Sequence, residues 1–413
     1  MLRFCLFVFW LSAPLAMART LTVGPQEAYR SIREALADAQ PYDTLKVKAG
    51  TYQEGNLEIT KPVVLWGINY PILDGQLKYE ILSVRASHVS IKGFRIINSG
   101  YASIQDIAGI RVYGVNQVNI LDNLLENTFF GIYLTNASNC RIWRNRLRAS
   151  ERAQYNIGNG IHLWKCQQAS IVGNHIARHR DGIYFEFVTN SLIQNNLSET
   201  NLRYGLHFMF SHNDRYENNT FRNNGAGVAV MYTQHVTMLR NHFEENWGDS
   251  AYGLLLKDIR DSHIEQNRFR KNTIGIYMEG TSRSLFAHND FAENGYAVRL
   301  QASCDDNTFE RNNFTGNTFD VATNGTMVLN TLRYNYWDKY EGYDLQHDGV
   351  GDVPYRPVSL YATILERIPQ AVILLHSFAV TLMDKVEKII PSLTPENLKD
   401  PSPLTHPVRY DTH

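Results

Sequence analysis

Five residues of types that bind soft metals recur at equivalent positions of a sequence repeat. They are His162, Glu186, His207, Met209 and Met231. Each lies in a segment of pattern Gly–apolar–x–apolar, in which strand geometry points the second and fourth residues after the glycine outward. Thioether and imidazole groups together suit copper, Cu(I) in particular. The alternative is that they are ordinary surface side chains on a sheet rich in aromatic residues.

The repeat that positions these residues runs from about residue 120 to residue 332. The glycine motif alternates with a second motif, in which an asparagine stands three residues after one apolar residue and two residues before another. These asparagines are Asn123, Asn145, Asn174, Asn195, Asn219, Asn241, Asn267, Asn289, Asn312 and Asn335. A period in the low twenties is typical of a solenoid, and apolar residues two apart indicate strands.

Short strands wound in one direction predict an all-β fold, a right-handed parallel β-helix of roughly ten coils. The apolar residues should point inward, and the asparagines should stack as a hydrogen-bonded ladder inside the turns. Some coils are longer, with insertions that include Ala149–Gly158 and Glu245–Tyr252. These insertions fall at one edge of the solenoid, which in repeat proteins often frames a working face.

The N-terminal residues indicate export and a capped solenoid. Residues 1–18 read as a secretory signal, with an apolar run too short to span a bilayer. Residues 19–86 form a cap and the first coils, with a helix from Ser31 to Ala39 that begins at a Ser31/Glu34 capping box. Residues 87–338 form the regular β-helix. We therefore expect a periplasmic location.

Composition excludes some functions. A net charge of -1 gives no reason to expect a nucleic-acid partner.

The mature chain retains Cys140, Cys166 and Cys304, and an odd number is not a disulfide framework. Cys140 and Cys166 lie in neighbouring coils, so a bridge between them and free buried thiols are both open; we favour free thiols.

An acidic loop at residues 339–359 follows the last coil. Asp344, Asp348 and Asp352 are spaced as in the first part of a calcium-binding loop, although no glutamate occupies its twelfth position. They predict a site for a hard cation such as calcium or magnesium. The alternative, which we prefer, is a tight acidic turn that closes the solenoid.

An apolar segment at residues 360–390 precedes a proline-rich tail at 391–413. The segment is too short to span a bilayer and too apolar for an exposed helix. It could plug the open end of the solenoid, but we favour docking at a membrane interface or on a membrane protein. The tail should be extended and ordered only against a partner. The predicted docking residues are Ile368, Val372, Leu375, Phe378 and Leu382.

The whole mature chain resembles the NosD family. The closing motif carries the resemblance most specifically: Asn335-Tyr336-Trp337-Asp338, Asp344, Asp348-Gly349, Gly351-Asp352 and Pro354-Tyr355. The resemblance implies a non-enzymatic periplasmic protein that helps to assemble the copper–sulfur centre of nitrous oxide reductase. It also implies that the protein interacts with the transmembrane subunit of an ABC transporter, with a copper chaperone and with the apo-reductase. The cargo would be copper or sulfur. The predicted His/Met ligands come from the pattern of residues alone.

Two other function classes are open. A polysaccharide lyase, hydrolase or epimerase, or a sugar-binding module, would also use a solenoid face. Such an enzyme needs clustered carboxylates, or a histidine beside an aspartate or tyrosine on consecutive coils. The outward columns offer one lone Glu186, flanked by His162, Tyr184 and His207, without a second acid at workable distance. A passive adhesin or structural rod would leave the apolar segment unexplained.

Overall fold

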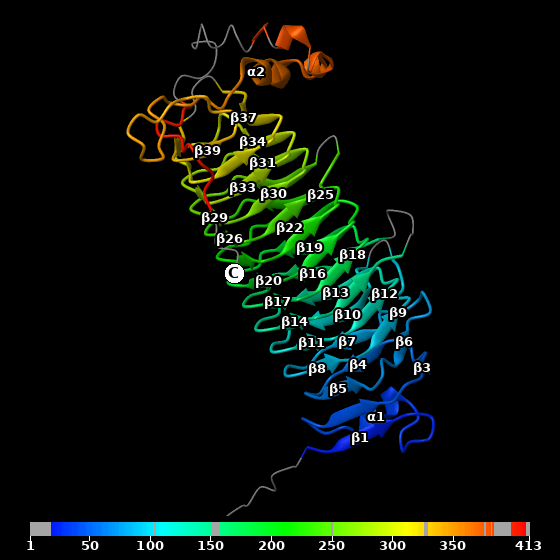
Figure 1. The fold of residues 1–413 in the computed structure, drawn as a ribbon. Coiled ribbons are helices and arrows are strands. Elements are labelled where there is room, and N and C mark those ends of the chain that lie inside the picture. The colour runs from blue at the N-terminus through cyan, green and yellow to red at the C-terminus, as the bar shows by residue number, and fades with distance from the viewer. Residues whose placement is uncertain are drawn as a thin grey trace, which may run out of the picture.

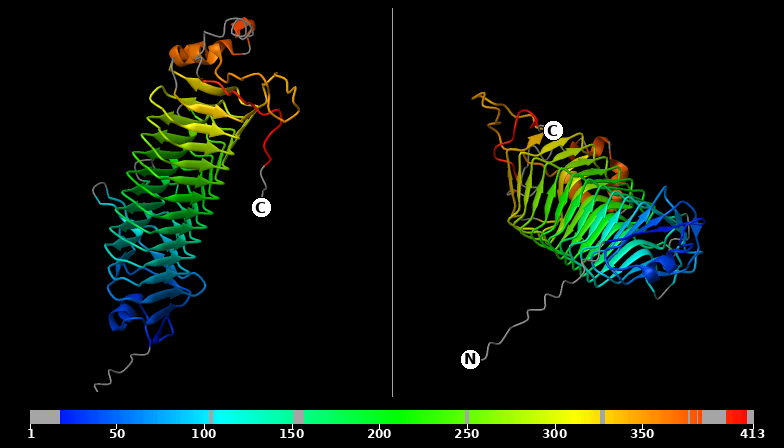
Figure 2. Two further views of the ribbon diagram at one scale, coloured as in Figure 1. Left: turned by 90° about the vertical axis from the view of Figure 1, so that its left-hand side faces the viewer. Right: turned by 90° about the horizontal axis from the view of Figure 1, so that it is seen from below.

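The computed structural model describes residues 18–102, 105–150, 157–248, 251–325, 329–375, 377–380, 382–383 and 398–409. In these residues, three parallel sheets wind around one axis to form an elongated column (Figure 1, Figure 2). The predicted all-β parallel solenoid is confirmed. The predicted secretory signal, apart from Ala18, lies outside the described residues.

Each coil adds one short strand to each sheet. The 14-stranded sheet contains, in pairing order, β1 (Thr20–Val23), β2 (Thr44–Val47), β5 (Val64–Gly67), β8 (Ser90–Lys92), β11 (Asn119–Leu121), β14 (Arg141–Trp143), β17 (Ser170–Val172), β20 (Leu192–Gln194), β23 (Arg215–Glu217), β26 (Thr237–Leu239), β29 (His263–Glu265), β32 (Leu285–Ala287), β35 (Thr308–Glu310) and β38 (Thr331–Arg333). The 12-stranded sheet contains β4 (Leu57–Ile59), β7 (Leu82–Val84), β10 (Ala108–Tyr113), β13 (Phe130–Thr135), β16 (Ile161–Trp164), β19 (Asp181–Glu186), β22 (Tyr204–Met209), β25 (Ala226–Met231), β28 (Tyr252–Lys257), β31 (Ile274–Glu279), β34 (Tyr296–Leu300) and β37 (Phe319–Thr323). The 13-stranded sheet contains β3 (Thr51–Tyr52), β6 (Ile72–Asp74), β9 (Arg95–Ile97), β12 (Leu124–Glu126), β15 (Arg146–Arg148), β18 (His175–Ala177), β21 (Leu197–Glu199), β24 (Thr220–Arg222), β27 (His242–Glu244), β30 (Arg268–Arg270), β33 (Asp290–Ala292), β36 (Asn313–Thr315) and β39 (Tyr336–Trp337).

The coils begin earlier than the asparagine repeat indicates. Pairing starts with Thr20 of β1, and sheets of 12 to 14 strands correspond to about 13 coils rather than ten. The first coils lack the repeated asparagine, so a count of asparagines misses them. Helix α1 (Ile32–Asp38) packs against this end of the column, and Ser31 Oγ accepts a hydrogen bond from the Glu34 N–H (3.1 Å), as the capping box predicts (Figure 1).

An asparagine ladder runs through one interior turn of the solenoid. Asn145 Oδ1, for example, accepts hydrogen bonds from the backbone N–H (3.0 Å) and side-chain amide (3.1 Å) of Asn123 one coil earlier. The predicted structural role is confirmed, with one correction: Asn196, and not Asn195, forms the fourth rung. Asn195 is exposed and has φ 54°, which is the left-handed conformation taken by the residue before each rung.

The interior also contains contacts that the repeat motif did not reveal. Stacked rings join successive coils, with centroids 4.1 to 5.6 Å apart in the series Phe221, Phe243, Phe269, Phe291, Phe314 and Trp337. A second ladder is formed by Asn201, Asn224, Asn246, Asn272, Asn294 and Asn317. These columns hold successive coils in register, and the register fixes which outward side chains are neighbours.

Segments of the same chain close the C-terminal end. Helix α2 (Leu360–Arg367) packs against β37 and buries Tyr361 and Leu365, and the 3-10 helix η2 (Pro369–Leu374) follows it. The plug interpretation therefore holds for α2. The described part of the predicted tail packs against the column: Asp400 is buried, and Val408 exchanges two hydrogen bonds with Asn313 of β36.

The three cysteines in the described part of the chain are free. Cys140, Cys166 and Cys304 are all buried and none forms a disulfide. The bridge between Cys140 and Cys166 is therefore not formed, and burial raises the pKa of the Cys166 thiol to about 12. Free buried thiols were the favoured prediction, and it is confirmed.

Candidate functional site

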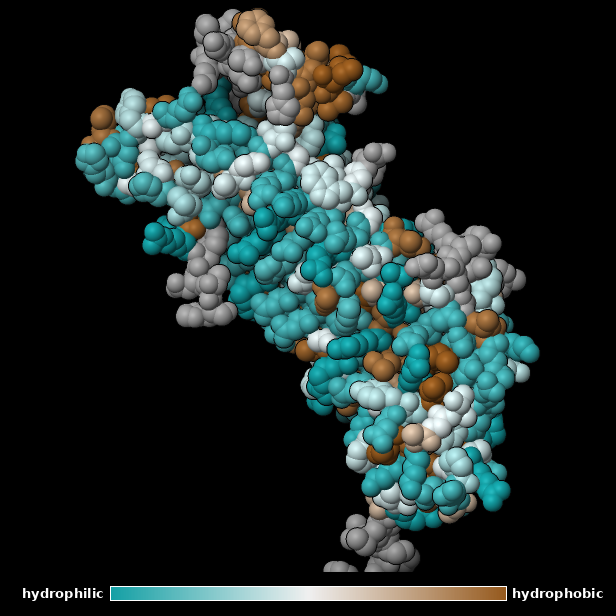
Figure 3. Space-filling view, turned by 45° about the vertical axis from the view of Figure 1, so that its right-hand side comes forward, coloured by the Kyte–Doolittle hydropathy of each residue, from teal (hydrophilic) through white to brown (hydrophobic). Residues whose placement is uncertain are grey.

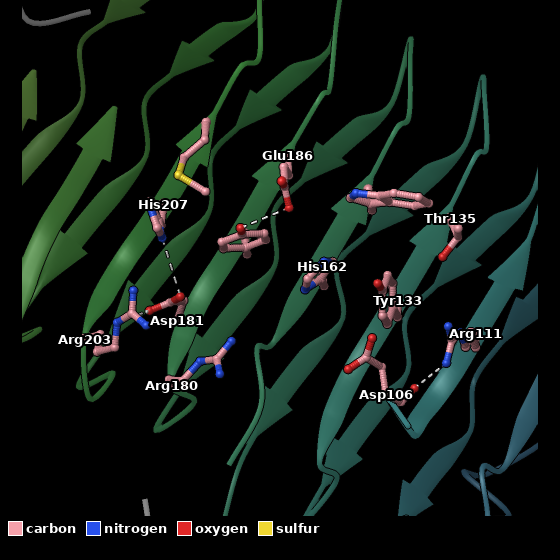
Figure 4. A pocket seen from close by; sticks show the side chains of 13 residues that line it. Asp106, Arg111, Tyr133, Thr135, His162, Arg180, Asp181, Glu186, Arg203 and His207 are labelled. Atoms are coloured by element: carbon pink, nitrogen blue, oxygen red, sulfur yellow. Dashed lines mark hydrogen bonds and ion pairs between the residues drawn. The ribbon is translucent and has the colours of Figure 1, made fainter. Parts of the chain in front are cut away.

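A pocket of about 580 Å³ opens on the outer face of the 12-stranded sheet (Figure 4). Its side chains come from β10, β13, β16, β19 and β22 and from the turns before these strands. The inner face of each strand is occupied by core side chains, so the alternate residues face the pocket. The polar lining includes Asp106, Arg111, His162, Arg180, Asp181, Glu186, Arg203 and His207.

Four of the five predicted copper ligands line this pocket. Met209 pairs in register with Glu186 on one side and with Met231 on the other. His207 lies two residues before Met209 and faces the same side. Met231 lies one coil beyond the pocket lining. Neighbouring coils are about 4.8 Å apart, so Glu186, Met209 and Met231 form one row beside His207.

His162 is separated from the other predicted ligands. The ring of Tyr184 lies between the two imidazoles, with its centroid 4.6 Å from His162 and 5.1 Å from His207. Two coil spacings put His162 and His207 about 10 Å apart, too far to bind one ion. Asn159 Nδ2 lies 3.0 Å from His162 Nδ1, and burial together with nearby Arg180 lowers the pKa of His162 to about 3, so the ring is neutral.

Asp181 is the residue that sequence reasoning missed. It is fully buried, with Oδ2 3.7 Å from His207 Nδ1 and Oδ1 3.5 Å from Arg203 Nε (Figure 4). Glu186 is thus not the lone acid of this face, because Asp106 and Asp181 line the same pocket. The sequence does mark this residue as unusual. Asp181 directly precedes the motif glycine, and that position is uncharged in the other repeats of the motif.

Two arginines occupy equivalent places on adjacent coils. Arg203 and Arg180 precede β22 and β19, and the Arg203 N–H donates a hydrogen bond to the Arg180 carbonyl (2.8 Å). Arg203 is paired with Asp181, whereas the structure gives Arg180 no ion pair with any described residue. Arg111 lies at the other end of the pocket, where its Nη1 donates to the Asp106 carbonyl (2.6 Å).

The carboxylates of the acidic loop accept hydrogen bonds from backbone N–H groups of the same loop. Asp344 accepts hydrogen bonds from the backbone N–H groups of Gly349 (2.9 Å) and Asp348 (3.3 Å). Asp352 accepts one from Leu345 (2.7 Å), and Asp348 accepts one from Val350 (2.9 Å). Across the described residues, no three His, Cys, Asp or Glu side chains are grouped closely enough to hold a metal ion. The bonds favour the acidic-turn interpretation, and the hard-cation site stays a prediction.

The apolar segment beyond α2 is largely exposed. The exposed fractions are 54% for Ile368, 56% for Val372, 82% for Phe378 and 51% for Leu382, and Leu375 is half-buried. Figure 3 shows apolar side chains gathered at this end of the column. No described helix is long and apolar enough to cross a membrane. The predicted docking residues thus lie on one exposed apolar part of the molecule, while residues 384–390 of the segment lie outside the described residues.

The fold and pocket define a parallel β-solenoid protein with a polar pocket on one sheet. Residues 148–342 match a family described as "Periplasmic copper-binding protein (NosD)". A relative from Pseudomonas aeruginosa, named a probable ABC transporter binding protein NosD, is 30% identical over 92% of this chain and 95% of its own length. A relative of the same name from Stutzerimonas stutzeri is 26% identical over 95% and 94%. The chain belongs to the NosD family.

Solved structures share the fold at low identity. The catalytic unit of a GH87 alpha-1,3-glucanase from Streptomyces thermodiastaticus gives a TM-score of 0.58 at 14% identity, over 74% of this chain and 65% of that one. A point mutant of the periplasmic alginate epimerase AlgG gives 0.50 at 12% identity, over 76% and 82%. These likenesses show the solenoid fold alone.

Proposed function

We propose that this chain is a periplasmic accessory protein, without enzymatic activity, for assembly of the copper centre of nitrous oxide reductase. It carries copper or sulfur as cargo and docks on the transmembrane subunit of an ABC transporter. A copper chaperone and the apo-reductase are its exchange partners. The family description as periplasmic copper-binding and the naming of relatives as ABC transporter binding proteins support this proposal.

The arrangement of His207 supports copper as the cargo. Histidines that bind metals commonly donate their other ring N–H to a carboxylate, which fixes the tautomer. Asp181 Oδ2 faces His207 Nδ1 at 3.7 Å, beyond hydrogen-bond distance in this structure, and would accept the Nδ1–H when Nε2 binds an ion. The flexible thioethers of Met209 and Met231 lie on the same face in adjacent coils. One imidazole and two thioethers form a soft ligand set that suits Cu(I), and Glu186 flanks it.

The apolar residues beyond α2 support docking. α2 itself is held on the column, where Arg299 Nη2 donates to Glu366 Oε2 (2.7 Å). Residues after it present Ile373 and Phe378 at 86% and 82% exposure. Exposed apolar surface of this kind marks interaction sites with proteins or membranes. The anchored helix would therefore present these residues to a membrane-embedded partner.

One observation favours a carbohydrate-active enzyme as a second candidate function. His207 and Asp181 lie on consecutive coils beside Tyr184 and Glu186, which is the arrangement a carbohydrate-active enzyme needs. Cleavage or epimerisation of uronide substrates by the purified protein would support this alternative, and its absence alongside Cu(I) binding would support the accessory role.

Competition with a chromogenic Cu(I) chelator tests the copper proposal. Combining Met209→Ala with Met231→Ala should weaken Cu(I) binding without unfolding the protein, because both side chains are only partly buried. His162→Gln is the matched control, since Tyr184 separates this residue from the ligand set. Equal Cu(I) affinity in the wild type and the double variant would refute the proposed site.

A further inference from the structure

The pocket contains buried hydrogen-bonding groups that the described residues leave unsatisfied. Both carboxylate oxygens of Asp181 and both ring nitrogens of His207 lack hydrogen-bond partners among these residues. The same holds for the Nε–H groups of Arg180 and Arg111. Buried polar groups in folded proteins nearly always have partners. Their concentration in one pocket indicates a ligand that supplies these partners.

A copper ion would satisfy only part of this set. A cation accepts lone pairs, so it can use the His207 imidazole and the neighbouring thioethers. It offers nothing to the N–H donors of Arg180 and Arg111, which need acceptor oxygens. The ligand that completes the pocket must therefore both donate and accept hydrogen bonds.

The charges and the length of the pocket narrow the ligand class. Three arginines and three carboxylates line it, so their formal charges cancel. A site without net charge gives no advantage to an anionic ligand over a neutral one. The lining spans five neighbouring strands from β10 to β22, or about 19 Å at the usual strand spacing. The ligand is therefore elongated along the solenoid axis.

We infer that this pocket binds a neutral oligosaccharide, which lies across the coils from Arg111 to His207. Each sugar hydroxyl both donates and accepts, so one oligosaccharide can meet both the arginines and the carboxylates that line the pocket. The half-buried Trp164 and Tyr184 supply apolar contact between these polar groups. This binding goes beyond the proposed accessory function and requires no catalytic step.

Calorimetric titration of the full chain with neutral tetrasaccharides (cello-, malto- and chitotetraose) tests the inference. At least one should bind, more tightly than its monosaccharide and more tightly than tetragalacturonate. Arg180→Gln should weaken that binding about tenfold or more, the effect expected for loss of a hydrogen bond to a charged group. Arg146→Gln, on a different sheet, is the control.

The outcomes separate this inference from the copper proposal. Arg180→Gln should lose saccharide and keep Cu(I), whereas Met231→Ala, outside the pocket lining, should lose Cu(I) and keep saccharide. Absence of binding by every neutral tetrasaccharide, or equal binding by Arg180→Gln and wild type, would overturn the site. Tighter binding of tetragalacturonate would overturn the ligand class, and equal binding of the monosaccharide would overturn the extended cleft.

Discussion

The carboxylate of Asp400 occupies the place of the next asparagine after Asn335 in the interior ladder. One oxygen, Oδ2, accepts hydrogen bonds from the Asn335 backbone N–H and side-chain amide, both at 3.0 Å, although the residues are 65 positions apart. The same oxygen accepts a bond from the indole N–H of Trp337 (3.1 Å). The C-terminal residues therefore satisfy the donors that the last coil would leave buried and unpaired.

Asp400→Ala should loosen the C-terminal end of the column, because it leaves these donors without an acceptor. We expect a loss of about 2–4 kcal/mol of local stability, measured by hydrogen exchange at the amides of Asn335 and Trp337. Asp400→Asn keeps an acceptor oxygen and should retain most of the protection. Unchanged exchange in Asp400→Ala would contradict the role of this residue as the terminal rung.

The two neighbouring asparagines of the fourth rung should respond differently to substitution. Asn196→Ala removes buried hydrogen bonds within the ladder and should lower the free energy of unfolding by about 2–4 kcal/mol. Asn195→Gly should be nearly neutral, because glycine adopts positive φ readily. Denaturant unfolding compares the two variants, and a larger loss in Asn195→Gly would show that the assigned rung is wrong.

Asp320 should make stability depend on pH. Burial raises the pKa of this carboxyl to about 6, with Lys339 Nζ 3.5 Å away. Between about pH 4 and 6 the folded protein holds a proton that the unfolded chain has released, so stability falls as pH rises through this window.

Asp320→Asn should remove this loss and stabilise the protein at pH 7.5 by roughly 2–3 kcal/mol. The advantage should vanish below about pH 4, where both forms are uncharged at this position. Thermal melts across the pH range provide the measurement. Asp305→Asn, at an exposed carboxylate, is the control and should leave the pH profile unchanged; a pH-independent difference between Asp320→Asn and wild type would refute the assignment.

Polar substitutions beyond α2 should impair docking without unfolding the column. Ile373→Ser with Phe378→Ser removes two highly exposed apolar side chains, each able to contribute about 1–2 kcal/mol to an interface. Recovery of a transmembrane ABC-transporter subunit from detergent-solubilised membranes should fall at least severalfold. Leu345→Ser, 73% exposed on the acidic loop, is the matched control. Equal recovery with the double variant would refute docking through this segment.

The apolar segment contains two environments, and docking through its exposed part stays a prediction. Tyr361 and Leu365 of α2 cover the last coil, as the plug alternative required. Ile368 and Phe378 are exposed, as docking requires. Hydrophobicity alone cannot separate these cases, because an apolar side chain is equally suited to its own core and to a partner.

The sequence alone determined the β-solenoid and the row formed by Glu186, Met209 and Met231. A local period fixes the coil, and stacking in register makes equivalent residues neighbours. Only the tertiary structure decided the composition of the pocket. Arg180 enters it from the turn before β19, while Tyr184 keeps His162 from His207. Asp181, the first residue of β19, shares the strand parity of the core residues Ile183 and Phe185, so alternation alone would not predict that it lines the pocket. Asp400 extends the ladder from a part of the chain outside the repeat. Because it lies 65 positions from Asn335, no sequence periodicity could predict this contact.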